Sequence, residues 1–328
     1  MAERVLVVGS GSFGTAIAVV AARRGAHVTL WARRPELAAE LRARRENVTF
    51  LQGVKLPENI EPVSEVGNAG QYDWVFSAVP TTYVRDVFSA LRWEYPPELP
   101  IVSLSKGIEQ SSLEFPTQIL LNVTRARHAL TLSGPSHAEE VARGLPCVLV
   151  SAGDDALAPR LATLLSGNSL RVYHSRDLVG VELAGAAKNV VAIAAGMVEG
   201  LGLGDNAKAA LLARGLAEIA RLGAAMGAQA RTFYGLSGLG DLYTTCASPY
   251  GRNRAFGVRV GKGEKPQAII DSMEMVAEGF NTAKALKTLA DSKGVEMPIC
   301  EEVCAILYGS ADPAEAVTRL MTRALKAE

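Results

Sequence analysis

A lysine stands in an otherwise apolar and small-residue stretch of this chain. Lys188 and Asn189 interrupt residues 180–196, in which Glu182 is the other charged residue. Helical spacing puts Glu182 and Gly185 roughly on the side of Lys188, so we expect the lysine to be partly buried. Burial of an ammonium lowers its pKa and makes the amine a proton donor or acceptor near neutral pH. The alternative is a structural lysine whose side chain extends along apolar surface to an interface.

Two further segments carry groups that can act beside such an amine. Asp241 follows a glycine-rich turn, residues 238–240, which has the flexibility to place a carboxylate next to Lys188. A helix N-cap is the competing role for this aspartate. Arg252 and Asn253 carry a guanidinium and an amide that can clamp a phosphate group, or they form a solvated helix start.

A glycine-rich loop near the start of the chain predicts a dinucleotide site. Residues 5–8 form a β-branched, apolar run, and Gly9, Gly11 and Gly14 follow it and open an Ala-rich helix. The first glycine permits a tight turn, the second lets the backbone approach a pyrophosphate, and the third lets helix and strand pack closely. The helix N-terminus then offers N–H groups to the anion. Residues 27–31 supply the second strand of the unit, and a turn without a ligand is the alternative.

The end of that second strand bears on the choice of coenzyme. A carboxylate at this point usually holds the ribose hydroxyls of NAD, whereas an arginine accepts the 2′-phosphate of NADP. This chain has Arg33 and Arg34 there, and no Asp or Glu. We therefore expect NADP(H) to be favoured, with NAD(H) as the alternative. Solvated surface charges are the competing interpretation of the two arginines.

The elements that must position these residues fall into two classes. Apolar strand-like segments alternate with helical ones in the first part of the chain, which predicts an α/β fold with a doubly wound, Rossmann-type parallel sheet. We expect these further elements: strands at 74–79, 101–104, 130–133 and 147–151, and a helix at 82–93. Ligands of such sheets bind outside the carboxyl ends of the strands, where Lys106 and the Gly134 to Ser136 turn stand.

The character of the sequence changes beyond residue 178. Long Ala, Leu and Gly-rich periodic segments replace the β-branched runs, which predicts an all-α domain. We expect helices at 181–200, 206–226, 252–260, 266–272, 279–293 and 299–307. The domains are thus predicted as a dinucleotide-binding domain, residues 1–178, and a helical domain for substrate binding and catalysis, residues 179–328.

Composition excludes several other classes of protein. The 34 basic side chains balance the 34 acidic ones, which argues against a nucleic-acid or membrane surface. We find neither a signal peptide nor an uninterrupted apolar run long enough to span a membrane, so we expect a cytoplasmic protein without membrane insertion. The four cysteines suit a reduced compartment, and we expect no metal site. We also expect a homodimer.

Together these motifs resemble the bacterial type of NAD(P)-dependent glycerol-3-phosphate dehydrogenase along nearly the whole chain. The resemblance rests on the motifs at residues 9–14, 105–107, 133–136, 181–189, 202–206, 238–241 and 252–253. It implies an oxidoreductase that interconverts sn-glycerol 3-phosphate and dihydroxyacetone phosphate and supplies phospholipid synthesis. The alternatives are another two-domain reductase, acting on a hydroxy acid or on ketopantoate, and a non-catalytic module that senses NADPH.

The resemblance also implies roles for individual residues. Lys188 corresponds to the catalytic proton acceptor in oxidation and donor in reduction. The residues implied around the substrate are Lys106, Gly134, Ser136, Asp241, Arg252 and Asn253, of which Lys106 and Arg252 also reach the coenzyme. Further implied coenzyme contacts are Ser12, Phe13, Arg33, Ala138, Val276 and Glu278.

Two positions depart from the family pattern. The family commonly has a serine before Arg252, where this chain has Gly251, so a hydroxyl on the substrate phosphate is missing. The backbone N–H of Gly251 is the group left to contact the phosphate. Phe13 replaces a tryptophan often found in the glycine loop and keeps an aromatic surface.

Overall fold

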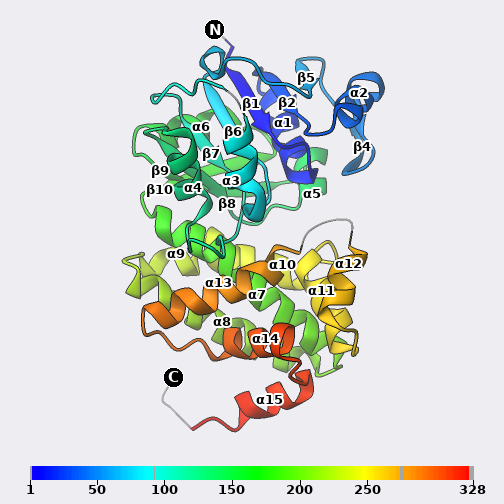
Figure 1. Cartoon of the computed structure of the whole chain (residues 1–328), viewed down its shortest axis with the longest axis vertical. Helices are drawn as coiled ribbons and strands as arrows, with labels where there is room; N and C mark the ends of the chain where they lie inside the picture. The colour runs from blue at the N-terminus through cyan, green and yellow to red at the C-terminus, as the bar shows by residue number, and fades with distance from the viewer. Residues whose placement is uncertain (1, 92, 274–276, 325–328) are drawn as a thin grey trace. The chain divides into compact units, whose positions relative to one another are not determined.

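A computed structural model describes residues 2–91, 93–273 and 277–324. The chain forms two compact units. The first comprises Met1–Lys106 and Glu114–Glu182, and the second comprises Gly107–Leu113 and Leu183–Glu328. The first unit is α/β and the second is helical, which confirms the predicted fold class (Figure 1).

An eight-stranded sheet forms the centre of the first unit, in the order β10-β9-β8-β7-β6-β1-β2-β5. Its strands are β1 (Arg4–Val8), β2 (His27–Trp31), β5 (Ile60–Val63), β6 (Trp74–Ser77), β7 (Ile101–Ser103), β8 (Ala129–Ser133), β9 (Cys147–Gly153) and β10 (Leu170–Ser175). β1 lies between β2 and β6, and both pairings are parallel. The chain order therefore reverses beside β1, which is where parallel sheets of this type bind ligands.

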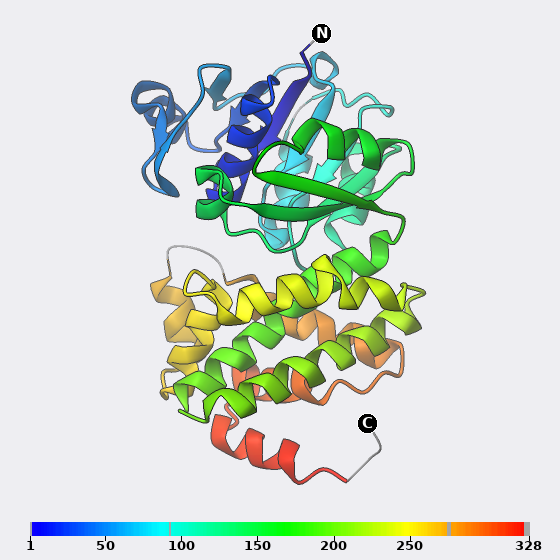
Figure 2. The ribbon, with the colours of Figure 1, turned by 180° about the vertical axis from the view of Figure 1, so that it is seen from behind.

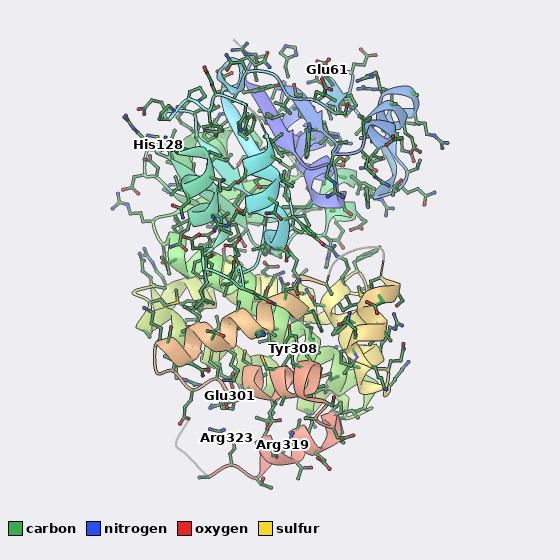
Figure 3. The ribbon with its side chains drawn as sticks, in the orientation of Figure 1. Glu61, His128, Glu301, Tyr308, Arg319 and Arg323 are labelled. Atoms are coloured by element: carbon green, nitrogen blue, oxygen red, sulfur yellow. The ribbon has the colours of Figure 1, made fainter. Side chains whose placement is uncertain are left out.

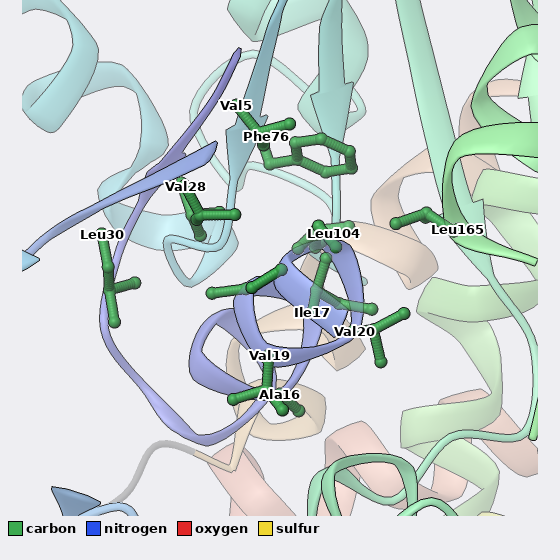
Figure 4. Close-up of a cluster of buried hydrophobic side chains, with 14 of the residues drawn as sticks. Val5, Ala16, Ile17, Val19, Val20, Val28, Leu30, Phe76, Leu104 and Leu165 are labelled. Carbon is green, nitrogen blue, oxygen red and sulfur yellow. The ribbon is translucent and has the colours of Figure 1, made fainter. Parts of the chain in front are cut away.

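Helices cover both faces of this sheet because its strands are apolar on both sides. Val5 and Val7 of β1 belong to one buried cluster with α1 (Ser12–Arg23), whereas Leu6 and Val8 belong to another. The first cluster also includes side chains of α2 (Pro35–Arg44), α5 (Ala138–Arg143) and α6 (Leu157–Leu165). The second includes those of α3 (Thr81–Ala90) and α4 (Pro116–Thr124). Figure 4 shows the first cluster around α1, from Val5 to Leu165.

One strand direction differs from the prediction. We expected residues 147–151 to continue the parallel series, but β9 runs antiparallel to β8, and β10 is parallel to β9. The connecting helix α5 packs against α1. The chain enters β9 directly after this six-residue helix and makes no long crossover of the kind that a parallel neighbour needs. Figure 2 shows β9 and β10 side by side at the edge of the sheet.

A small hairpin, absent from the sequence expectation, follows α2. Its strands β3 (Glu46–Asn47) and β4 (Leu51–Lys55) pair antiparallel. The predicted helix at 82–93 also differs, since α3 ends at Ala90.

The second unit contains the predicted helices with small changes at their ends. They are α7 (Leu178–Gly200), α8 (Gly204–Ala225), α11 (Arg252–Gly261), α12 (Pro266–Ser272), α13 (Glu278–Ser292) and α14 (Pro298–Gly309). Four elements were not predicted: α9 (Ala230–Tyr234), a π-helical turn at Leu236–Gly240, α10 (Asp241–Ala247) and α15 (Pro313–Met321). Ion pairs of Arg319 with Glu302 and of Arg323 with Glu296 join α15 and the residue Arg323 after it to α14 and the segment before α14. Figure 3 labels Arg319, Arg323 and the α14 residue Glu301.

Helix α7 is the core of the second unit. By length and composition it could cross a membrane, but 89% of its most apolar window is buried inside the protein. Glycines bring α7 and α11 into direct backbone contact: a Cβ on Gly196 would overlap the carbonyl oxygen of Arg254, and one on Gly257 would overlap that of Ile193. The position of Lys188 on α7 is therefore fixed by tight helix packing.

Candidate active site

The glycine loop between β1 and α1 has the geometry of an anion site. Gly9 has a φ of +115°, and a Cβ there would lie 2.8 Å from the carbonyl oxygen of Ala78. A Cβ on Gly14 would overlap the carbonyl oxygen of Gly9. Gly11 differs from both, because its φ is −69° and nothing lies within 4 Å of the place where its Cβ would stand.

The open space beside Gly11 fits a coenzyme phosphate. Neither backbone conformation nor internal packing requires a glycine at this position, so close approach of an outside group is the remaining reason for it. Gly11 is also the N-cap of α1 and provides no side chain to cap the helix. The first N–H groups of α1 thus face an anion site without a competing side-chain cap.

The other predicted coenzyme residues of the first unit stand at the starts of helices or just after β2. Arg33 and Arg34 follow β2 and are both exposed, and Arg34 is the N-cap of α2. Neither arginine side chain forms an ion pair within residues 2–91, 93–273 and 277–324. Phe13 is half-buried against the core, and Ala138 is the first residue of α5. Ser12 begins α1.

Three predicted substrate residues of the first unit come together at one carbonyl group. Lys106, which follows β7, donates from Nζ to the carbonyl oxygen of Gly134 at 2.9 Å. The Oγ of Ser136 donates to the same oxygen at 3.0 Å. Gly134 has a φ of +120°, which allows the turn after β8 to present its carbonyl in this way. The turn thus gathers an amine and a hydroxyl at one point.

Lys188 is buried and paired in the second unit. Its side chain is 8% exposed, and its Nζ lies 2.6 Å from Oδ1 of Asp241 and 2.5 Å from Oγ1 of Thr245. Asp241 is the first residue of α10, and its carboxylate bonds to Lys188 rather than capping the helix. The N-cap alternative for Asp241 is therefore wrong, and the burial expected for Lys188 is present.

Sequence reasoning missed Thr245. Its Oγ1 donates to the carbonyl oxygen of Asp241 at 2.7 Å and accepts from Lys188, so it fixes the direction of the amine. The signal was the spacing of four residues between Asp241 and Thr245, which places both on one face of a helix. The next residue, Cys246, is fully buried, and burial raises the pKa of its thiol to about 12. This thiol stays protonated at neutral pH.

Glu182, which helical spacing puts roughly on the side of Lys188, bonds to α4. Its carboxylate accepts hydrogen bonds from the backbone N–H and the Oγ1 of Thr117, at 3.1 and 2.5 Å. Burial raises the pKa of this carboxyl to about 7. The partner of Lys188 is therefore Asp241, and Glu182 anchors the first turns of α7 to α4.

The phosphate-clamp residues open α11. Arg252 is exposed, whereas Asn253 is buried, with its Nδ2 on Oδ1 of Asn189 at 3.0 Å and its Oδ1 accepting from the N–H of Gly279 at 2.9 Å. Gly251 is the N-cap of α11, and its N–H donates to the carbonyl oxygen of Ser248 at 3.2 Å. The N–H of Gly251, which we expected to contact the phosphate, is thus already bonded, and the N-terminus of α11 has no side-chain cap.

Two predicted coenzyme residues remain. Glu278 is the first residue of α13 and is half-buried. Val276 lies outside the described residues. Within the described part of the chain, no group of three or more His, Cys, Asp or Glu side chains is arranged to hold a metal ion.

Comparison with known proteins identifies the family. The model of the NAD-dependent glycerol-3-phosphate dehydrogenase N-terminus matches residues 4–158, and that of its C-terminus matches residues 177–318. A glycerol-3-phosphate dehydrogenase (NAD(P)+) from Geobacter sp. (strain M21) is 46% identical over 333 residues, which covers 100% of this chain and 99% of that protein. One from Moorella thermoacetica is 45% identical over 325 residues, covering 98% of this chain and 97% of the relative. The crystal structure of glycerol-3-phosphate dehydrogenase from Coxiella burnetii has a TM-score of 0.91 at 32% identity, covering 98% of this chain and 99% of that one. The chain belongs to the NAD-dependent glycerol-3-phosphate dehydrogenase family.

Proposed function

We propose that this chain interconverts sn-glycerol 3-phosphate and dihydroxyacetone phosphate with NAD(P)+ and NAD(P)H. The observation that carries the proposal is the buried amine of Lys188, held by Asp241 at 2.6 Å and by Thr245 at 2.5 Å. A reaction that converts a hydroxyl to a carbonyl needs a group that takes and returns one proton at a fixed position. An apolar helix that carries one oriented amine meets this need.

The glycine loop is the proposed coenzyme site. When bound there, the nicotinamide supplies or accepts the hydride. The loop residues Gly9, Gly11 and Gly14, with Ser12 and Phe13, hold the pyrophosphate at the N-terminus of α1. The further contacts that we propose are Lys106, Ala138, Arg252, Val276 and Glu278.

Lys188 carries the proton in this proposal. In reduction its ammonium gives one proton to the oxygen that was the carbonyl of dihydroxyacetone phosphate. In oxidation its neutral amine takes the proton of the same hydroxyl. Asp241 and Thr245 keep Nζ in one direction during both steps, which limits the reorganisation that proton transfer requires.

The substrate phosphate requires cationic and N–H groups. Arg252 and the N-terminus of α11, which follows the N-cap Gly251 and includes Asn253, provide them in the second unit. In the first unit, Lys106, Gly134 and Ser136 provide an amine, a carbonyl group and a hydroxyl for the polar groups of the substrate. An exposed arginine and a helix N-terminus without a side-chain cap support the phosphate assignment.

An assay of NADPH oxidation tests the proposed function directly. We expect turnover with dihydroxyacetone phosphate and none with ketopantoate or with 2-keto and 3-keto acids. Turnover with ketopantoate alone would replace this function by that of the other two-domain reductase. Tight NADPH binding without turnover of any of these compounds would favour the alternative of a non-catalytic module that senses NADPH.

We further propose that NADPH is preferred to NADH, because Arg33 and Arg34 stand where a ribose-binding carboxylate would be needed for NAD. Arg33→Asp should weaken NADPH by about tenfold or more through the loss of a charged contact to the 2′-phosphate. The affinity of the same variant for NADH is the internal control and should be retained or rise, because the new carboxylate can hold the ribose hydroxyls. An unchanged preference would move the recognition of the 2′-phosphate to other residues.

A homodimer in the cytoplasm that supplies phospholipid synthesis completes the proposal. Sedimentation of the purified chain tests the dimer, and fractionation of cells tests the compartment. Loss of the gene product should lower the pool of sn-glycerol 3-phosphate available for phospholipids.

A further inference from the structure

The β3–β4 hairpin reaches the glycine loop through one side chain, Asn47. This residue is 1% exposed. Its Nδ2 donates to the carbonyl oxygen of Ser10 and to Oγ1 of Thr15, both at 2.8 Å. Its Oδ1 accepts from the N–H of Phe50 at 3.1 Å. The two donors and the acceptor of the amide are all in use, and a rotated amide would set oxygen against oxygen at Ser10.

The bond to Ser10 constrains the next peptide group. The carbonyl of Ser10 and the N–H of Gly11 belong to the same planar trans peptide and point in opposite directions. The hydroxyl of Thr15 also donates to the Ser10 oxygen, at 3.3 Å. With that oxygen held by Asn47 and Thr15, the N–H of Gly11 is directed away from the hairpin.

We propose that Asn47 is a positioning residue for the dinucleotide. It holds the peptide between Ser10 and Gly11 so that the N–H of Gly11 points to the phosphate of the coenzyme. This inference rests on the proposed function, which places the pyrophosphate beside Gly11. Without Asn47 the peptide can rotate and present the Ser10 oxygen to the phosphate, which repels it.

Asn47→Asp is the sharpest variant. The side chain keeps its size and its bond to the N–H of Phe50, but it loses both donors and sets an oxygen against that of Ser10. Because NADH and NADPH share the pyrophosphate, we expect the dissociation constants of both to rise by the same factor, about tenfold or more. The kcat at saturating coenzyme should stay near that of the unchanged chain, so the loss appears in KM.

The chain offers a matched control at the other end of the same helix. Nδ2 of Asn59 donates to the carbonyl oxygens of Ala22 and Ala26, at 2.8 and 2.7 Å, where α1 ends. Asn59→Asp likewise removes an Nδ2 group that donates to two acceptors, one in the last turn of α1 and one just after it, but it lies away from the glycine loop. We expect it to lower the Tm as Asn47→Asp does, while the affinity for NADH and NADPH is retained.

Thr15→Val provides a second test if Asn47→Asp does not fold. It removes one of the two groups that donate to the Ser10 oxygen and keeps the side-chain shape, so we expect a smaller, equal rise in both dissociation constants. Wild-type affinity in the Asn47→Asp or Thr15→Val variants overturns the inference, as does an equal loss in Asn59→Asp. Coenzyme binding and turnover are measured separately, so a chain that binds NADPH but does not reduce dihydroxyacetone phosphate contradicts the proposed function alone.

Discussion

The glycine loop of the first unit and the lysine of the second are built in opposite ways. The loop consists of neighbouring residues, 9–14, and the binding groups that we propose for it are backbone N–H groups without side chains in front of them. The site around Lys188 consists of side chains that are 53 and 57 residues apart in the sequence. A backbone site is therefore sensitive to the size of an added side chain, whereas the lysine site is sensitive to charge and protonation.

Substitution of Lys188 should have the largest effect on activity. Lys188→Ala removes the proposed proton carrier, and kcat should fall by about a thousandfold or more. Lys188→Arg sharpens this test, because a guanidinium keeps the positive charge beside Asp241 but does not give up its proton near neutral pH. Steady-state kinetics with dihydroxyacetone phosphate and NADPH measures both variants, and the binding of NADPH should be retained in both.

A second lysine of the same unit serves as the control. Lys208 pairs with Glu199 at 3.2 Å and has no role in the proposed chemistry. Lys208→Ala should keep the kcat of the unchanged chain. Retention of most of the rate in Lys188→Ala would remove Lys188 from the mechanism.

Substitutions at two glycines of the loop distinguish its structural role from its proposed role in binding. Gly14→Ala would overlap the carbonyl oxygen of Gly9 and should lower the free energy of unfolding by about 3 kcal/mol or more. Gly11→Ala meets no neighbour within 4 Å and has an ordinary φ of −69°, so the variant should fold as the parent does. Its methyl group would occupy the space that we propose for the pyrophosphate, and NADPH affinity should then fall by about a hundredfold. Calorimetric unfolding and ligand titration measure the two effects, and full coenzyme affinity in Gly11→Ala would contradict the proposed site.

The first unit was predictable because its signals are local. The strand at 5–8, the glycines and the helix follow one another, and each residue's role depends on its neighbours. The direction of β9 was not predictable, because a buried apolar strand has the same composition whether it runs parallel or antiparallel. Direction depended on the short α5, which the sequence did not distinguish from a longer crossover.

The partner of Lys188 could be anticipated only in part. Asp241 stood out in the sequence as a carboxylate after a glycine-rich turn. Nothing in the sequence distinguishes Thr245 from other helical threonines, because its role depends on its contact with Lys188 of α7. The glycines of residues 235–240 also conceal the helical periodicity of that region, where the chain forms a π-helical turn. Contacts between distant side chains depend on packing that single-sequence periodicity does not encode.

The buried carboxyl of Glu182 makes the stability of the protein depend on pH. The pKa of Glu182 is raised to about 7 by burial, above its ordinary value of 4.5. The folded protein therefore holds a proton that the unfolded chain has released between these values, and the free energy of unfolding falls as the pH rises from about 4.5 to 7. The shift corresponds to at most about 3 kcal/mol.

Glu182→Gln tests this assignment because the amide mimics the protonated carboxyl. The variant should lose this part of the pH dependence and should be more stable than the parent above pH 7, by up to about 3 kcal/mol. Urea unfolding across this pH range measures the slope. If the free energy of unfolding depends on pH in Glu182→Gln as it does in the parent, the dependence comes from other groups. One of them is Glu218, whose pKa burial also raises to about 7.

The smallest expected effect concerns Gly251, one of the two positions that depart from the pattern of the family that the sequence resembles. Gly251→Ser restores the hydroxyl that the family commonly has there, yet a Cβ at this point would lie 2.6 Å from the carbonyl oxygen of Thr245, which must then shift. Thr245 orients Lys188, so a shift at its carbonyl reaches the lysine site through α10. We expect the free energy of unfolding to fall by about 1 kcal/mol and the KM for dihydroxyacetone phosphate not to decrease. A lower KM in Gly251→Ser would contradict this expectation. It would show that the protein accommodates the serine and that the added hydroxyl contacts the substrate phosphate, with a larger effect on affinity than the crowding at Thr245.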